Sequence, residues 1–253
     1  MRKYLIVLVL LVCSCAGGRI PDDFCYKEID VDGFVIASWQ KITDKTKNYK
    51  VYIEGDGASF NAYGYPTKNP TPKGKLLRES AFGDENANVI YLARPCQFVM
   101  GGICSQRHWT TARFASEIIR AQGDAIASIV GKKEVVLVGF SGGAQVAGLV
   151  ASLRKDLNIK KVITIAGNLD HLAWTRFHNL PSLNESMSLS DYKDIFFEFE
   201  QMHFIGSNDE VIVPSLVYDF VKDAKSDKIE VIEVNSATHN SGWESVYDII
   251  RSQ

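Results

Sequence analysis

The sequence predicts an α/β fold in which one mostly parallel sheet carries helices on both faces. Short runs of β-branched and other apolar residues alternate along the chain with longer segments whose apolar residues recur at helical spacing. The 253 residues, of which 46% are apolar, suffice for a single large domain with a full core. The net charge of −2 gives no indication of a nucleic-acid partner.

The strand and helix signals follow one another in order along the chain. Strands are expected at residues 34–40, 49–55, 88–93, 134–138, 161–166, 201–206 and 229–234. Helices are expected at residues 110–130, 144–157, 215–224 and 243–251. Three prolines between residues 66 and 72 are typical of an irregular surface loop. The irregular pattern of residues 168–195 predicts a small cap insertion above the sheet, with apolar surface from Trp174, Phe177 and Leu180.

Residues 1–15 are expected to be a signal segment that precedes the folded domain. Arg2 and Lys3 form a short positive region, and an uninterrupted apolar run follows at residues 5–12. This run is too short to span a bilayer comfortably, so the pattern favours a secretory signal over a transmembrane helix. The sequence therefore predicts an exported protein.

The end of this segment, Val12-Cys13-Ser14-Cys15, resembles a bacterial lipobox. The resemblance implies that Cys15 is lipidated and anchors the protein to a membrane of the cell envelope. Ordinary signal cleavage near Ala16 is the alternative. Residues 16–30 are expected to form a linker, and residues 31–253 the folded domain.

Two cysteines in the middle of the chain are close enough in sequence to form a disulfide. Gly101 and Gly102 lie between Cys96 and Cys104 and would let the chain turn back. Because disulfides persist in exported proteins, we expect these two cysteines to be bonded, with two unpaired thiols as the alternative. His108 stands alone after Cys104, so the spacing predicts no zinc site.

The pentapeptide Gly139-Phe140-Ser141-Gly142-Gly143 matches the G-x-S-x-G pattern of a nucleophile elbow. The β-branched run at residues 134–138 leads into it and the helical pattern at residues 144–157 follows, which is the context that this motif requires. The two outer glycines would allow strand and helix to approach closely around a strained serine. We therefore expect Ser141 to be a nucleophile, with a plain structural turn as the alternative.

A serine hydroxyl needs a base to accept its proton and an acid to orient that base. Asp209 follows the predicted strand 201–206, and His239 follows the predicted strand 229–234. Both side chains are therefore expected at the carboxyl edge of the sheet, where open α/β sheets place their ligands. Glu210 is the alternative acid, and a turn or helix-cap role is the alternative for Asp209.

The negative charge that develops on a substrate oxygen needs backbone N–H donors. Gly142, the residue after the serine, is expected to supply one of them. The second is expected from Asp56, Gly57 or Ala58, in the glycine-containing segment that follows the second predicted strand. A plain glycine-rich turn is the alternative for this segment.

Together, the pentapeptide 139–143, Asp209 and His239 resemble the α/β-hydrolase family, and the resemblance extends from about residue 34 to residue 250. The chain is also similar to a group of uncharacterised exported bacterial hydrolases. The shared segments are residues 53–57, residues 91–96, Cys104 with residues 109–110, and residues 168–171 with Trp174. The resemblance implies the α/β-hydrolase fold and a serine hydrolase triad, which needs no metal or organic cofactor.

Members of this family act on esters, thioesters, amides and peptides, so the resemblance alone does not define a substrate. We expect an exported, membrane-anchored serine hydrolase that cleaves a small-molecule carboxylic ester through an acyl-enzyme on Ser141. A peptidase, thioesterase or acyltransferase with the same triad is the alternative within enzymes. A non-catalytic envelope lipoprotein that kept the fold is the alternative outside them.

Overall fold

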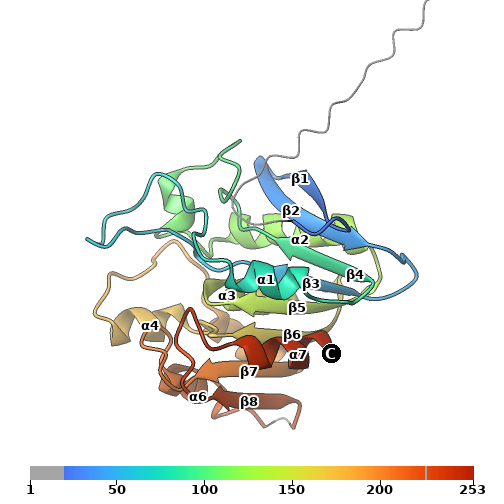
Figure 1. Cartoon of the computed structure of the whole chain (residues 1–253). Coiled ribbons are helices and arrows are strands. Elements are labelled where there is room, and N and C mark those ends of the chain that lie inside the picture. The colour runs from blue at the N-terminus through green and yellow to red at the C-terminus, as the bar shows by residue number, and fades with distance from the viewer. Residues whose placement is uncertain (1–19, 226) are drawn as a thin grey trace, which may run out of the picture.

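The computed structural model describes residues 20–225 and 227–253, and within these ranges eight strands form one sheet. The strand order is β1-β2-β4-β3-β5-β6-β7-β8 (Figure 1). Strand β2 pairs antiparallel with β1 and β4, and all pairs from β4 to β8 are parallel. The predicted mostly parallel sheet is therefore confirmed.

The elements alternate along the chain as the periodicity predicts. The strands are β1 (Cys25–Val31), β2 (Phe34–Ile42), β3 (Tyr49–Ile53), β4 (Asn88–Leu92), β5 (Glu134–Phe140), β6 (Asn158–Ile165), β7 (Glu200–Gly206) and β8 (Ile229–Val234). The α-helices are α1 (Leu76–Phe82), α2 (Ser116–Val130), α3 (Gly142–Leu153), α4 (His171–Phe177), α5 (Lys193–Phe196), α6 (Pro214–Val221) and α7 (Glu244–Arg251). Two 3-10 helices are η1 (Gln106–Trp109) and η2 (Leu189–Tyr192).

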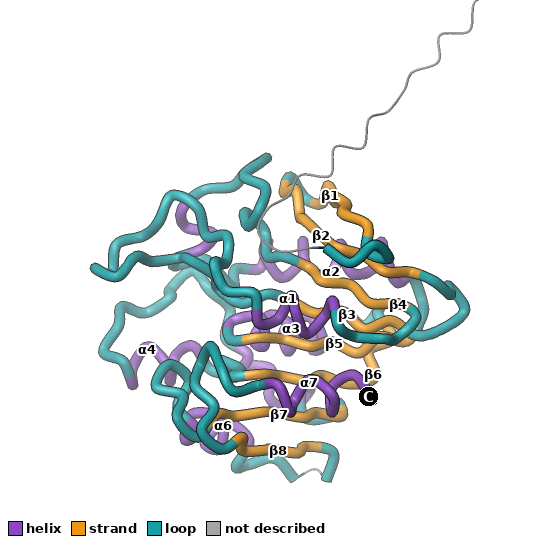
Figure 2. The backbone as a smooth tube through the Cα atoms, in the orientation of Figure 1, coloured by secondary structure: helices purple, strands orange, loops and turns teal. Residues whose placement is uncertain are grey.

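Helices cover both faces of the sheet, so the central strands are buried on each side (Figure 2). Helices α2, α3 and α6 pack with one set of strand residues, which includes Val51 and Ile53. Helices α1 and α7 pack with the alternate set, which includes Tyr52 and Tyr91. Because successive side chains of a strand point to opposite faces, one continuous apolar run such as β3 fills both cores.

The predicted linker at residues 16–30 is wrong from residue 25 on, because Cys25–Val31 forms strand β1. This edge strand is mostly exposed and lacks a regular apolar alternation, so its periodicity is weak. Asp32 and Gly33, with φ of +49° and +82°, form the tight turn into β2. An Asp-Gly pair between two strands is a strong hairpin signal, and it is the feature of the sequence that could have identified β1.

Other boundaries differ from the expectation in ways that have local causes. Helix α2 begins at Ser116 and not at residue 110, because Ala115 is extended, with φ of −63° and ψ of 158°. The sequence predicts no helix where α1 forms, because this short segment directly follows the proline-containing loop. The predicted signal segment, Cys15 and the first four linker residues lie outside the described residues. None of the helices within the described ranges is long and apolar enough to cross a membrane.

The expected disulfide is present. Cys96 and Cys104 are bonded, with their Cα atoms 5.6 Å apart. Cys96 is fully buried, and the bridge closes the loop that follows β4. Cys25 is exposed on β1 and forms no disulfide within the described residues.

A buried ion pair lies at the amino-terminal half of β3. The Nζ atom of Lys50 is 3.1 Å from the Asp84 carboxylate and donates a 2.6 Å hydrogen bond to the carbonyl of Ile250. Tyr52 donates a 2.7 Å hydrogen bond to the same carboxylate. These contacts join β3 to the end of α7 on the face of the sheet that α1 and α7 cover.

His203 is a buried residue of β7. It is 0% exposed, with Nδ1 2.8 Å from the Thr164 hydroxyl and Nε2 3.0 Å from Oε1 of Gln201. These partners suit a neutral ring that donates from Nε2 and accepts at Nδ1. Burial lowers the pKa of His203 from 6.5 to about 3.

The low pKa of His203 should make the free energy of unfolding depend on pH. Below pH 6.5 the unfolded chain binds a proton at this position that the folded protein does not bind until about pH 3, so stability falls as the pH falls. Between pH 7.5 and 5.0, the wild type should lose about 2 kcal/mol more than His203→Gln does. Urea unfolding of both proteins at the two pH values measures this difference, and an identical pH dependence would contradict it.

Candidate active site

Ser141 lies at the junction of β5 and α3, at the carboxyl edge of the sheet. Its φ of +50° is in the left-handed region, which side chains other than glycine rarely adopt. A Cβ atom at residue 139 would lie 2.6 Å from the backbone of Ala144, and one at residue 143 would collide with the carbonyl of Ile53. The strand–turn–helix geometry predicted for the pentapeptide is therefore present, and both outer glycines are required by close backbone contact.

The three residues predicted to act together form one hydrogen-bonded relay. Oγ of Ser141 is 3.1 Å from Nε2 of His239, and Nδ1 of His239 is 2.9 Å from Oδ2 of Asp209. The other carboxylate oxygen accepts hydrogen bonds from the backbone N–H groups of Val211, at 2.8 Å, and Ile212, at 2.9 Å. When Nδ1–H donates to the carboxylate, Nε2 is left free to accept the serine proton.

The relay comes from three segments that follow parallel strands of the sheet. Ser141 follows β5, Asp209 follows β7 and His239 follows β8. The Asp209 side chain is 0% exposed, whereas the alternative acid, Glu210, is at the surface. The ring of Phe140 lies 5.2 Å from the His239 ring, centroid to centroid, and supports the imidazole from one side. The structure therefore brings together the acid and the histidine that the sequence order and the strand context indicate.

Two histidines of the insertion do not line the cleft beside Ser141. His171 is fully buried against α3, where Gln145 binds its ring and its backbone N–H. His178 is 2.8 Å from the carbonyl of Val211, to which Nε1 of Trp174 also donates, at 2.9 Å. Helix α4 is therefore hydrogen-bonded to the segment that holds the acid.

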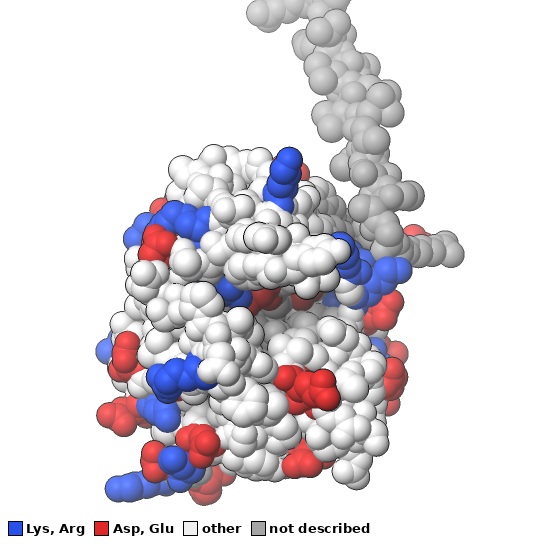
Figure 3. All heavy atoms as spheres, turned by 90° about the vertical axis from the view of Figure 1, so that its left-hand side faces the viewer, with Lys and Arg blue, Asp and Glu red and all other residues white. Residues whose placement is uncertain are grey.

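Ser141 opens into a cleft of about 680 Å³ on the face formed by the carboxyl ends of the parallel strands. Figure 3 shows this face, with a hollow that has both basic and acidic atoms on its floor. Within the predicted cap, Trp174 lines the cleft. Phe177 and Leu180, the other two apolar residues of the predicted cap, do not line the cleft and are 53% and 45% exposed.

Part of the cleft wall comes from residues for which the sequence predicted no role in the site. Residues 59–62 and 72–77, with Val211 and Ile212, line the cleft in addition to the predicted segment 56–58. The sequence interpretation of a proline-containing surface loop was correct for the backbone, but it did not reveal that the loop passes beside Ser141. The loop and Ser141 lie far apart along the chain, and a contact between such distant residues leaves no periodic pattern in the sequence.

The segment expected to supply the second oxyanion donor lies against the start of α3. The N–H of Gly55 donates to Oε1 of Glu54 at 2.8 Å, and the N–H of Ala58 donates to the carbonyl of Pro70 at 2.9 Å. Within the described residues, the N–H groups of Asp56 and Gly57 have no such acceptor. The structure thus reduces the three candidates to Asp56 and Gly57, beside Gly142 at the first position of α3.

Glu54, which precedes this segment, is a buried carboxylate. Its second oxygen accepts a hydrogen bond from the Tyr91 hydroxyl. Burial raises the pKa of Glu54 above its ordinary value, although the hydrogen bonds from Tyr91 and Gly55 act in the opposite direction. These hydrogen bonds therefore fix the Glu54 side chain at the start of the segment 55–58.

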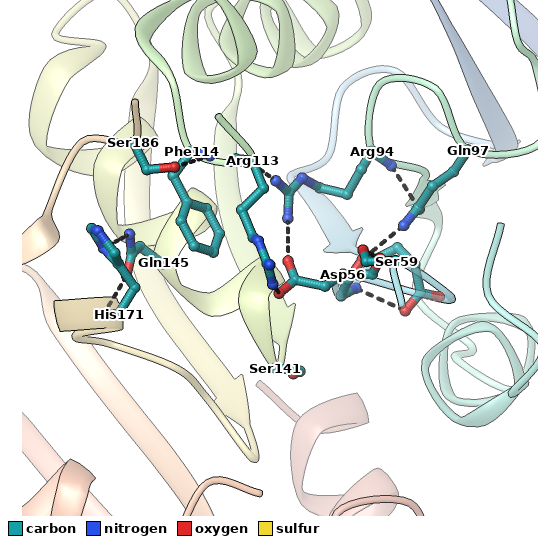
Figure 4. A network of polar contacts seen from close by, with 12 residues as sticks. Asp56, Ser59, Arg94, Gln97, Arg113, Phe114, Ser141, Gln145, His171 and Ser186 are labelled. Carbon is teal, nitrogen blue, oxygen red and sulfur yellow. Dashed lines mark hydrogen bonds and ion pairs between the residues drawn. The ribbon is translucent and has the colours of Figure 1, made fainter. Parts of the chain in front are cut away.

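The Asp56 carboxylate is held between two buried arginines (Figure 4). Its oxygens lie 3.4 Å from Nη1 of Arg94 and 2.7 Å from Nη1 of Arg113. Burial alone would raise the pKa of Asp56, but the charges and hydrogen bonds of Arg113 and Arg94 lower it below its ordinary value. Gln97 adds a 2.8 Å hydrogen bond from Nε2 to the carbonyl of Gly55. Sequence reasoning missed these partners, because Arg94 and Arg113 are distant from Asp56 along the chain.

The arrangement combines a serine, a histidine that can accept its proton, a buried acid and unpaired backbone N–H groups. It therefore contains all the groups needed for acyl transfer through a covalent intermediate. Within the described ranges, no group of His, Cys, Asp or Glu side chains could hold a metal ion.

Comparisons with solved structures support this interpretation of the fold. The chain is similar to the esterase Pf2001 from Pyrococcus furiosus, with a TM-score of 0.64 and 18% identity over 94% of this chain and 92% of that one. It is similar to Est1E from Butyrivibrio proteoclasticus, with a TM-score of 0.62 and 15% identity over 90% of this chain and 96% of that one.

A third similar structure is XC6422 from Xanthomonas campestris, a lidless α/β serine hydrolase, with a TM-score of 0.55 and 12% identity over 93% of this chain and 94% of that one. At these identities the likeness shows the α/β-hydrolase fold. No curated protein sequence matches the chain significantly.

A family model described as "Serine hydrolase (FSH1)" matches residues 105–240, which is more than half of the chain. The matched region contains the serine, the acid and the histidine of the relay. This protein therefore belongs to the FSH1 family of serine hydrolases and is a hydrolase with the α/β-hydrolase fold.

Proposed function

We propose that this hydrolase cleaves a small-molecule carboxylic ester through an acyl-enzyme on Ser141. The observation that carries the proposal is the relay from Asp209 through His239 to a serine that opens into a cleft. Two of the similar structures are esterases, which supports an ester as substrate.

In the first half of the reaction, Oγ of Ser141 attacks the acyl carbon while Nε2 of His239 accepts the hydroxyl proton. The same nitrogen then donates this proton to the oxygen of the leaving alcohol, and the acyl group remains on the serine. Asp209 stabilises the imidazolium through the 2.9 Å contact with Nδ1. Because Val211 and Ile212 hold the other carboxylate oxygen, the acid keeps its orientation throughout.

In the second half, a water molecule replaces the alcohol. His239 removes a proton from this water, whose oxygen attacks the acyl carbon, and then returns the proton to Oγ of Ser141 as the acid leaves. In both halves, negative charge develops on the former carbonyl oxygen. The N–H of Gly142 and that of Asp56 or Gly57 are the donors for this charge.

The shape of the cleft supports acyl groups of small or medium size. Phe60, Phe140 and Trp174 supply apolar surface to a cleft of about 680 Å³. Pockets of this volume are typical of small-molecule sites.

We further propose that the enzyme is exported and anchored to the cell envelope through a lipid on Cys15. The apolar run and lipobox-like sequence at the start of the chain support this location. The Cys96–Cys104 disulfide is consistent with it, because disulfides persist outside the reducing cytoplasm.

Labelling by a fluorophosphonate probe tests the nucleophile. The wild type should react covalently and Ser141→Ala should not, since the probe modifies only an activated serine. Esters, thioesters and anilides of one acyl group with the same chromophore should then be cleaved in favour of the ester. Equal labelling of Ser141→Ala, or preference for the anilide or thioester, would contradict the proposal, and an unlabelled wild type would favour the non-catalytic alternative.

Replacing the carboxylate that the two arginines hold should impair transition-state stabilisation. Asp56→Asn should lower kcat roughly 10- to 100-fold with little change in KM, because a misplaced oxyanion donor weakens binding of the transition state more than that of the substrate. Asp84→Asn is the matched control, because it removes another paired carboxylate at a residue that does not line the cleft. The control should lose stability but retain kcat, and an unchanged kcat in Asp56→Asn would count against the role of this segment.

Removing the proposed lipid site should release the protein from the membrane. Cys15→Ala should move the protein from the membrane fraction to the soluble fraction of its host cell. Cys25→Ala is the control, since this exposed cysteine lies on β1 and outside the lipobox-like sequence. Membrane partitioning that Cys15→Ala leaves unaltered would argue against lipidation.

A further inference from the structure

Charged side chains of both signs line the cleft beside Ser141. Three are basic, Lys73 and Lys75 on the exposed segment before α1 and the buried Arg113. Two are acidic, Glu54 and Asp56. The acidic and the basic side chains differ in how many of their hydrogen-bonding atoms already have partners in the protein.

Each carboxylate oxygen of Glu54 and Asp56 already has a hydrogen-bond or ion-pair partner. One oxygen of Glu54 accepts from the N–H of Gly55 and the other from the Tyr91 hydroxyl. The two oxygens of Asp56 face Arg94 and Arg113, one each. A positively charged substrate would therefore find no carboxylate oxygen in the cleft wall without a partner.

The basic side chains retain free donors. Within the described residues, neither Lys73 nor Lys75 makes an ion pair. Arg113 donates from Nε to the carbonyl of Thr110 at 2.8 Å and from Nη1 to Asp56, while Nη2 has no acceptor in the described part of the chain. The cleft thus presents positively charged side chains with N–H groups that have no acceptor within the described residues.

The positive charges of the cleft exceed the negative ones. Arg94 and Arg113 share the single negative charge of Asp56, and the charge of Arg94 also acts on Glu54. Burial lowers the pKa of Arg94 to about 10, which leaves it protonated at neutral pH. Two guanidinium groups therefore accompany two carboxylates, and the two lysines at the rim add positive charge that no carboxylate of the cleft lining offsets.

We infer that the substrate carries a carboxylate or phosphate group, on either its acyl or its alcohol part, that binds Arg113 and the lysines at residues 73 and 75. Anionic oxygens form strong charge-assisted hydrogen bonds with guanidinium groups, and a positive cleft also raises the local concentration of an anion. The inference rests on the proposed esterase function and defines the substrate class of the same site.

Two pairs of esters separate the two positions of the anionic group. The first pair is the p-nitrophenyl half-ester of glutarate and its neutral methyl ester, which differ in charge on the acyl part. The second pair is the butyrate ester of 4-hydroxybenzoate and that of methyl 4-hydroxybenzoate, which differ in charge on the alcohol part. In at least one pair the anionic ester should have a kcat/KM roughly 10- to 100-fold higher, and salt should reduce this ratio.

The ratio within each pair also identifies the residues responsible. Lys73→Gln with Lys75→Gln, and separately Arg113→Gln, should each lower the ratio. Arg113→Gln also disturbs Asp56, but a loss common to both esters cancels in the ratio. The matched control is Lys45→Gln with Lys47→Gln, which removes two exposed lysines of equal spacing from the β2–β3 turn, at the opposite edge of the sheet. The control should keep the wild-type ratio.

A wild-type ratio of one or less in both pairs would overturn the inference, as would a ratio that neither the lysine variant nor Arg113→Gln changes. Absence of both ester cleavage and probe labelling would instead contradict the proposed function. In that case, titration of Ser141→Ala with the same two pairs decides the inference through affinity alone. Tighter binding of an anionic ester supports it, and equal binding in both pairs overturns it.

Discussion

The site depends on one close backbone approach, where the first turn of α3 packs against the carboxyl ends of β3 and β5. The absence of side chains at Gly139 and Gly143 permits this contact, and the strained backbone of Ser141 follows from it. The same approach sets Gly142 beside the segment after β3. One constraint thus places Ser141 and both candidate oxyanion segments, while β7 and β8 need only bring Asp209 and His239 to the same edge.

Residues with a local signal could be predicted from the sequence, and residues positioned by distant contacts could not. Ser141, Asp209 and His239 each follow a clear apolar strand, so their places at the sheet edge could be inferred. Strand β1 was missed because its exposed residues lack alternation, although its Asp-Gly turn was visible. The arginines around Asp56 carry no local pattern, because tertiary structure alone brings them to that carboxylate.

The electrostatic environment of the cleft differs between its floor and its rim. On the floor, Asp56 and its arginines are buried, so their contacts are screened little by water and can fix the position of a backbone segment. At the rim, Lys73 and Lys75 are exposed, so their charges are screened more strongly by water and salt. Charged groups of the same cleft therefore differ in how strongly the solvent weakens their interactions.

The two hydrogen bonds from α4 to the carbonyl of Val211 bear on how a substrate reaches the serine. Trp174 and His178 donate to the same residue whose N–H holds Asp209. An outward swing of α4 would break these bonds and disturb the acid at the moment of entry. Helix α4 and the acid are therefore structurally linked, and a displacement of Trp174 in the cleft wall would be transmitted to Asp209 through Val211.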